Sequence, residues 1–172
     1  MCEYNAWANN RLLEKYIELE RDLGVTHAVS LAVRTALVHV LEGEQQWRGA
    51  CQAGEQWPDL YVDGFPNAQA LRRVFADEQN EWRTFLGGLD DGRMDANVEW
   101  TNSLDEVSAR PLWQVLYHVF NHGTQHRAEI ASLLSQHDRS PGDLDLVLFL
   151  WEQEHSSTAP AGFQPCLTFL VS

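Results

Sequence analysis

The chain of 172 residues has the length of a single domain with one hydrophobic core. Its 12 basic and 25 acidic residues give a net charge of −13, which argues against nucleic acid and anionic lipid as partners, since both need clustered Lys and Arg. No run of eighteen apolar residues and no signal-peptide pattern occurs, so we expect a cytoplasmic protein that does not span a membrane.

Five helices are predicted in chain order. Helical periodicity predicts a first helix over residues 3–22, ended by Gly24, and a second from about residue 26 to 51. After a loop with two prolines, a third helix is expected over about 67–86. The segment "MDANVEWTNSLDEVS" predicts a short hairpin. A fourth helix is expected from Pro111 to about residue 136, and a fifth from its cap Asp143 to about residue 152.

Long helices joined by modest loops predict an all-α fold, namely a four-helix bundle with a short fifth helix and a small hairpin between helices three and four. We assign residues 1–154 to this bundle and 155–172 to a C-terminal tail, whose structure the sequence leaves undetermined.

Three widely spaced cysteines, Cys2, Cys51 and Cys166, form no disulfide framework and are expected to be reduced thiols.

The segment "HVFNHGTQHRAEI", residues 118–130, places three histidines four residues apart. At about 100° per residue, His126 lies inside the apolar stripe of the fourth helix, His122 on its edge and His118 outside it. His118 and His126 lie about 12 Å apart along the axis, so a straight helix offers one ion the pair His122 and His126. The alternative is that a carboxylate, carbonyl or water satisfies these imidazoles. Arg127, about 60° from the stripe centre, is expected to form a salt bridge.

A bundle site needs a further ligand from another helix, and His39 on the second helix is the candidate. Small residues share its face, which either leaves space for a ligand or lets another helix approach closely. Glu42 and Gln46 lie near the same face and are candidate catalytic or substrate-contacting groups, with Glu42 as a general base. The alternative for both is a solvated helix edge. The small residues on the His39 face are Ala28, Ala32, Thr35, Ala36, Gly43 and Ala50.

These residues resemble the DinB/YfiT-like family of metal-dependent proteins, in the family's order over roughly residues 4–152. The "NHGTQHRAEI" segment is the most specific part of the match. The sequence departs from the family pattern at Gln125, where many members have a histidine, and at Ala128, where glycine is frequent. The matching segments are "YNAWANNRLL", "HVLEGEQQW", "PLWQVLYHVFNHGTQHRAEIASLL" and "PGDLDLVLFLW".

The resemblance implies a bundle with up-down-down-up connections, usually a homodimer. It also implies a metal held by His39, His122 and His126, the three residues that the helical-face argument selects. The ion is expected to be a divalent transition metal such as Zn, Ni, Mn or Fe.

Characterised members of the family include transferases and isomerases that use low-molecular-weight thiols. We therefore expect a metal-dependent enzyme that acts on a small molecule, with a thiol S-transferase as the expected class. One alternative is a stress-linked binding or interaction module with a structural metal or none, which a closed site with a fourth protein ligand would favour. Another alternative is a metal-dependent hydrolase.

Overall fold

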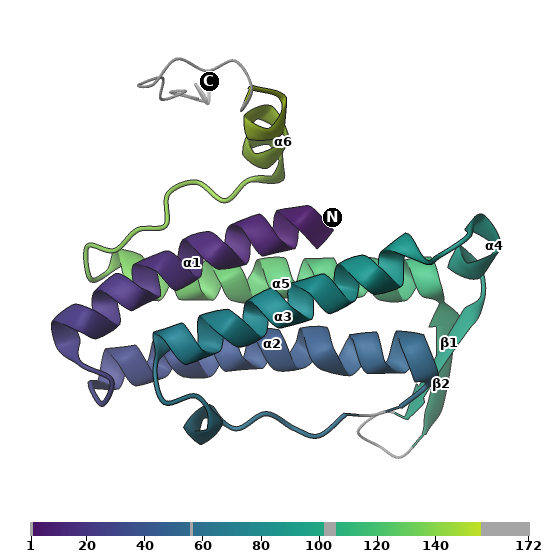
Figure 1. Cartoon of the computed structure of the whole chain (residues 1–172), viewed down its shortest axis with the longest axis horizontal. Coiled ribbons are helices and arrows are strands. Elements are labelled where there is room, and N and C mark those ends of the chain that lie inside the picture. Colours follow the sequence, from purple (N-terminus) through teal and green to yellow (C-terminus); the bar gives the residue numbers. More distant parts are fainter. Residues whose placement is uncertain (1, 56, 102–105, 156–172) are drawn as a thin grey trace. The chain divides into compact units, whose positions relative to one another are not determined.

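The computed structural model describes residues 2–55, 57–101 and 106–155. Four long helices lie side by side and confirm the predicted all-α bundle (Figure 1). The second and third of them run in one direction and the first and last in the other, which is the up-down-down-up order (Figure 1). The four helices are α1 (Cys2–Leu23), α2 (Ala28–Ala53), α3 (Ala68–Gly87) and α5 (Leu112–Ser135).

The first two helices are joined by a tight turn. Gly24, with φ of +88°, adopts the left-handed conformation that lets the chain leave α1, as predicted. His27 caps α2, since its Nδ1 accepts a hydrogen bond from the backbone N–H of Val29 at 3.3 Å. At the other end of α2, Gly54 is left-handed with φ of +68° and ends the helix.

The loop between α2 and α3 contains a short 3-10 helix, η1 (Val62–Gly64). Two side chains then hold the start of α3. The Asn67 side chain accepts a hydrogen bond from the N–H of Ala70, and the Glu20 carboxylate of α1 accepts one from the N–H of Ala68. The N-terminus of α3 is therefore fixed both by its own cap and by the neighbouring helix.

The predicted hairpin is present between α3 and α5. Strands β1 (Asn97–Thr101) and β2 (Val107–Pro111) pair in antiparallel register, with Asn97 opposite Pro111. A single helical turn that the sequence did not predict, α4 (Asp91–Met94), precedes the hairpin. Pro111 precedes α5 as its cap rather than lying in its first turn.

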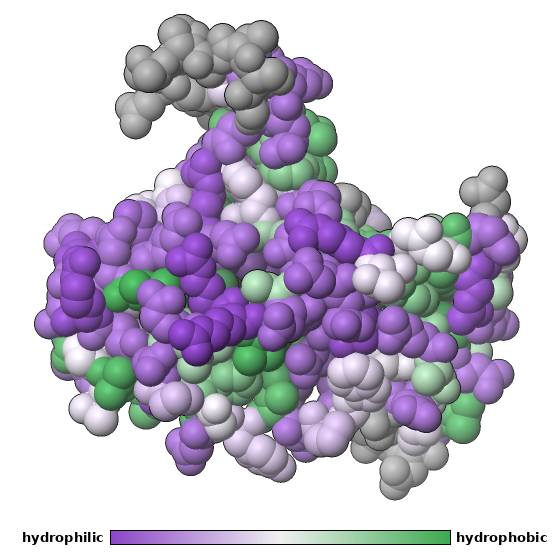
Figure 2. All heavy atoms as spheres, viewed as in Figure 1, coloured by the Kyte–Doolittle hydropathy of each residue, from purple (hydrophilic) through white to green (hydrophobic). Residues whose placement is uncertain are grey.

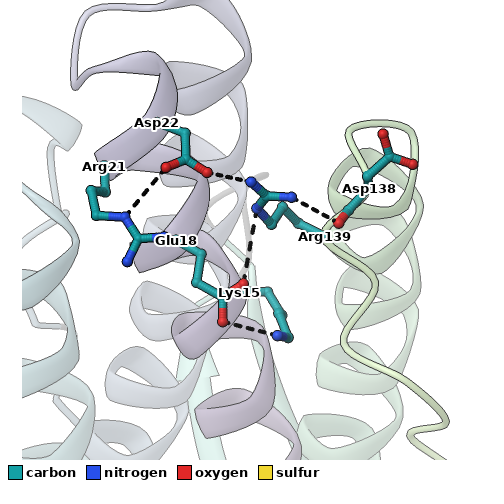
Figure 3. A network of polar contacts seen from close by, with 6 residues as sticks. All are labelled: Lys15, Glu18, Arg21, Asp22, Asp138 and Arg139. Atoms are coloured by element: carbon teal, nitrogen blue, oxygen red, sulfur yellow. Dashed lines mark hydrogen bonds and ion pairs between the residues drawn. The ribbon is translucent and has the colours of Figure 1, made fainter.

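Arg139 ties the segment after α5 to α1 (Figure 3). Its guanidinium donates to the Asp22 carboxylate, and its Nε lies 3.9 Å from an Oε2 of Glu18. Lys15 contacts the other oxygen of Glu18 at 2.9 Å. The face of the bundle seen in Figure 2 is mainly hydrophilic, in keeping with the charged composition.

The chain forms two units, Met1–Gly142 and Asp143–Ser172. In the second unit the predicted fifth helix is α6 (Leu146–His155), which begins two residues later than a cap at Asp143 implies. Asp143 does not cap it directly, because its Oδ1 accepts a hydrogen bond from the N–H of Asp145 in the preceding turn. The tail from residue 156, with Cys166, lies outside the described residues.

None of the described helices combines the length and apolar character needed to cross a membrane.

Candidate metal centre

Three histidines from two helices meet at the contact between α2 and α5. The candidate ligand atoms of His39, His122 and His126 all lie within 4.8 Å of one another. Their ring centroids are 5.5 Å apart for His39 and His122, 4.6 Å for His39 and His126, and 4.4 Å for His122 and His126. The structure therefore brings together the three residues that the sequence selects, and their role as metal ligands stays a prediction.

The small residues on α2 allow this close approach. A Cβ atom placed on Gly43 would lie 3.2 Å from Cε1 of His122 and 3.4 Å from its Nδ1. Larger side chains at this position would push the imidazole away from α2. Of the two readings of the small-residue face, close helix packing is the one that Gly43 shows.

Burial and neighbouring charge keep His122 neutral. The pKa of His122 is lowered to about 4, mainly by burial, with the neighbouring His126, His39 and His118 acting in the same direction. At neutral pH the ring therefore carries an unprotonated nitrogen. A neutral imidazole is the form that binds a metal ion, so the donor chemistry fits a divalent transition metal.

Each of two rings has a carboxylate nearby on the following helical turn, and one of these carboxylates forms a hydrogen bond with its ring. Nδ1 of His126 lies 2.9 Å from Oε2 of Glu129, so it donates its proton there and leaves Nε2 as the free ligand atom. Nδ1 of His39 lies 3.6 Å from Oε2 of Glu42, too far for a hydrogen bond. Pairing of a ligand histidine with a carboxylate is common at metal sites.

The three-histidine group is open to solvent on one side. The side chain of His39 is 51% exposed, whereas that of His126 is 18% exposed. Within residues 2–55, 57–101 and 106–155, no fourth His, Cys, Asp or Glu joins the group. Three protein ligands and an accessible side are typical of catalytic sites, while structural sites have four.

Glu42 and Gln46, the candidate catalytic groups, both bind the loop that follows α2. Oε1 of Gln46 accepts from the N–H of Trp57 at 3.1 Å, and its Nε2 donates to the carbonyl of the same residue. Oε1 of Glu42 accepts from the N–H of Leu60 at 2.9 Å. The structure thus gives these side chains a role in holding the loop against α2, and their participation in chemistry stays a prediction.

The prediction that Arg127 forms a salt bridge is wrong. It forms no salt bridge with any described residue and is only 1% exposed. Its guanidinium instead donates to Oδ1 of Asn5 at 3.0 Å and to Thr124 at 2.9 Å, and lies over the Tyr4 ring. In the sequence, the spacing of Asn5 and Asn9 places them on the same side of the first helix, and the structure shows that both are buried there.

Gly123 makes room for this arginine. A Cβ atom there would lie 2.7 Å from Nη1 of Arg127, so the guanidinium would have to move. Arg127 follows the candidate ligand His126 directly in the chain, so its contacts with α1 fix the rotation of α5 that turns His122 and His126 toward α2.

Comparison with known proteins agrees with this architecture. The model of the DinB family matches residues 1–158. Protein DinB of Bacillus subtilis (strain 168) is 23% identical over 167 residues, which cover 90% of this chain and 95% of that protein. No solved structure matches the chain significantly. Because the family model covers most of its length, the chain belongs to the DinB family.

Proposed function

We propose that this protein is a divalent-metal-dependent enzyme that transfers a low-molecular-weight thiol to a small electrophilic molecule. The observation that carries the proposal is the set of three imidazoles with ligand atoms within 4.8 Å and one accessible side. Family membership supports a metal-binding enzyme. The use of a thiol and the identity of the acceptor are our additions to that reading.

Each histidine has a distinct part in the site. Glu129 orients His126 so that Nε2 is free, and burial keeps His122 unprotonated. His39 lies on the exposed side, where a substrate enters. A divalent ion held by these residues supplies a positive charge that favours the deprotonated form of a thiol or water beside it.

The proposed transfer forms one bond and breaks another. The thiol sulfur bonds to the electrophilic carbon of the acceptor, the leaving group departs with its bonding electrons, and the thiol proton passes to solvent. No oxidant or reductant is consumed. Glu42 and Gln46 hold the loop after α2 against the helix that carries His39.

The test is transfer of cysteine or glutathione to 1-chloro-2,4-dinitrobenzene by zinc-, nickel-, manganese- or iron-loaded protein. The proposal predicts metal-dependent release of chloride with formation of the thioether. His122→Ala removes this activity, and His137→Ala, an exposed histidine at the end of α5, retains it. Metal-dependent cleavage of p-nitrophenyl acetate without thiol transfer would instead support a hydrolase. A metal-loaded protein inactive in both assays would support a binding module.

A further inference from the structure

A hollow of about 370 Å³ lies beside the three-histidine group, where the hairpin meets α2 and α5. This volume is within the range of small-molecule sites. Its lining includes Trp47 of α2, Trp100 of β1, Ser108 and Arg110 of β2, and Gln114 and His118 of α5. Side chains from four elements therefore converge on one depression of the surface, with α2 distant in the sequence from the consecutive β1, β2 and α5.

Aromatic rings form a continuous row through this hollow. Trp47 packs edge-to-face against Trp100 at 5.1 Å between centroids and against His118 at 5.0 Å. Neither Trp47 nor Trp100 is in the buried core, since both keep part of their surface in solvent. Rigid, half-exposed rings of this kind provide flat apolar surface for stacking with a planar ligand, at little cost in conformational entropy.

The charge of the hollow is opposite to that of the molecule. Arg110 is its cationic side chain, and none of its lining residues is acidic, although the chain carries a net charge of −13. The two adjoining hollows contain acidic side chains, Asp59 in one and Glu55 with Glu99 in the other. A carboxylate therefore finds favourable charge in the Arg110 hollow and repulsion in its neighbours.

The guanidinium of Arg110 has donors to offer. Among the residues that the structure describes, Arg110 forms no ion pair, and its Nη1 donates to the backbone carbonyl of Ala109 at 2.7 Å. A guanidinium presents five N–H groups in a planar fork that matches a carboxylate. The Ser108 hydroxyl and the Gln114 amide line the same hollow and add further polar contacts.

His118 connects the hollow to the candidate metal centre. Its ring lines the hollow, and its centroid lies 5.7 Å from that of His122. A molecule in the hollow therefore lies one imidazole ring away from the three-histidine group. The position of His118 on α5 excludes it from the three-histidine group. Its place in the lining of the hollow gives it a role in ligand binding instead.

We propose that the hollow lined by Trp47, Trp100, Arg110 and His118 binds a planar aromatic carboxylate. The rings stack with the aromatic part and Arg110 pairs with the carboxylate. That this ligand is the acceptor substrate rests on the proposed function, whereas the binding itself needs no metal.

The test is isothermal titration calorimetry of the full chain with 2-naphthoate, before and after zinc loading. Two comparison ligands separate the contributions, since 2-naphthalenemethanol keeps the rings without the charge and decanoate keeps the carboxylate without the rings. The proposal predicts that 2-naphthoate binds the metal-free protein at least tenfold more tightly than either comparison ligand.

Variants locate the binding. Arg110→Gln is expected to weaken 2-naphthoate about tenfold and leave 2-naphthalenemethanol unchanged, and Trp100→Leu to weaken both aromatic ligands. The matched controls are Arg72→Gln, at an exposed position of α3, and Trp113→Leu, on the exposed side of α5. Both are expected to leave the affinities for the two aromatic ligands unchanged. Circular dichroism verifies that each variant is folded.

Three results would overturn the proposal: no binding of 2-naphthoate, equal binding of the three ligands, or equal effects of Arg110→Gln and Arg72→Gln. Binding that appears only after zinc loading would also contradict it, because the carboxylate would then be coordinating the ion. Metal content is measured on the same samples. A protein that binds zinc but not 2-naphthoate would contradict the proposal for the hollow alone, and a protein that binds no zinc would contradict the three-histidine site.

Discussion

The geometry of His126 depends on one exposed carboxylate. Glu129 accepts a hydrogen bond from Nδ1 of His126 at 2.9 Å, and this contact lowers the pKa of the Glu129 carboxyl. Because the carboxylate selects the tautomer with a free Nε2, its effect is on metal binding. The pair lies at the surface of α5 and contributes little to the stability of the fold.

Glu129→Gln is therefore expected to weaken metal binding about tenfold, the lower end of the range for such partners, without a change in melting temperature. A chelator-competition titration with zinc measures the affinity. Glu14→Gln, an equally conservative change at an exposed position of α1, serves as the control and leaves the affinity unchanged. Equal affinities for the wild type and Glu129→Gln would show that the carboxylate does not act on the ligand.

Between elements, two arginine–glutamate pairs of the same geometry join α3 to its neighbours. Arg48 of α2 contacts Glu78 through Nε at 2.6 Å and Nη2 at 2.8 Å, and Arg83 contacts Glu3 of α1 through the same atoms at 2.7 Å and 2.8 Å. Their environments differ, because the first pair is 3% and 1% exposed and the second 44% and 56%. Because the two pairs share their geometry and differ in burial, comparing them shows how burial changes the contribution of an ion pair to stability.

Glu78→Gln is expected to lower the free energy of unfolding by about 3 kcal/mol, since it leaves the buried Arg48 cation with only the exposed Glu81 carboxylate, 3.7 Å away. Glu3→Gln, the same change in the exposed pair, is expected to cost less than about 1 kcal/mol. Urea denaturation at pH 7 measures both. Similar losses for the two variants would contradict the view that burial decides the contribution.

At the scale of the whole molecule, the acidic charge extends into the core. Glu44 of α2 is 8% exposed and accepts a hydrogen bond from Nδ2 of Asn9 at 3.1 Å. Burial raises the pKa of the Glu44 carboxyl to about 7, with the Glu78 charge acting in the same direction and the Arg127 charge opposing it. The titration of a core residue therefore falls in the physiological range.

This pKa predicts that stability falls as the pH rises. Between about pH 4.5 and 7 the folded protein holds a proton on Glu44 that the unfolded chain has lost, so the contribution is fully present below pH 4.5 and disappears as the pH rises through 7. The loss amounts to about 3 kcal/mol at most. Denaturation of the wild type and Glu44→Gln from pH 5 to 8 measures it. The variant is expected to show a flatter profile, and parallel profiles would refute the assignment.

The sequence predicts the elements of this molecule better than the contacts between them. Periodicity and capping residues are local, so the four long helices and the end at Gly24 follow from neighbouring residues, whereas α2 runs two residues past its predicted end, to Ala53. The helical face of α5 likewise separates His122 and His126 from His118. Angular position alone did not predict that Arg127 would be buried, because its partners Asn5 and Asn9 lie more than a hundred residues away.

The loop contacts of Glu42 and Gln46 were hidden for a similar reason. Both were expected near the face of His39, and both are, but their partners are backbone groups of Trp57 and Leu60. Backbone groups carry no sequence signature of their own. A helical wheel therefore locates these side chains on a face without showing which groups they bind.

The central claim is that His39, His122 and His126 form one metal site, and elemental analysis tests it most directly. The protein is purified without a histidine tag and reconstituted with zinc, nickel, manganese or iron, beside the alanine variant of each histidine and of His118. The account predicts about one ion per chain in the wild type and in His118→Ala, and loss of the ion in each of the other three variants. A wild type that stays empty with every metal, or a His118→Ala protein that loses the ion as the others do, would contradict it.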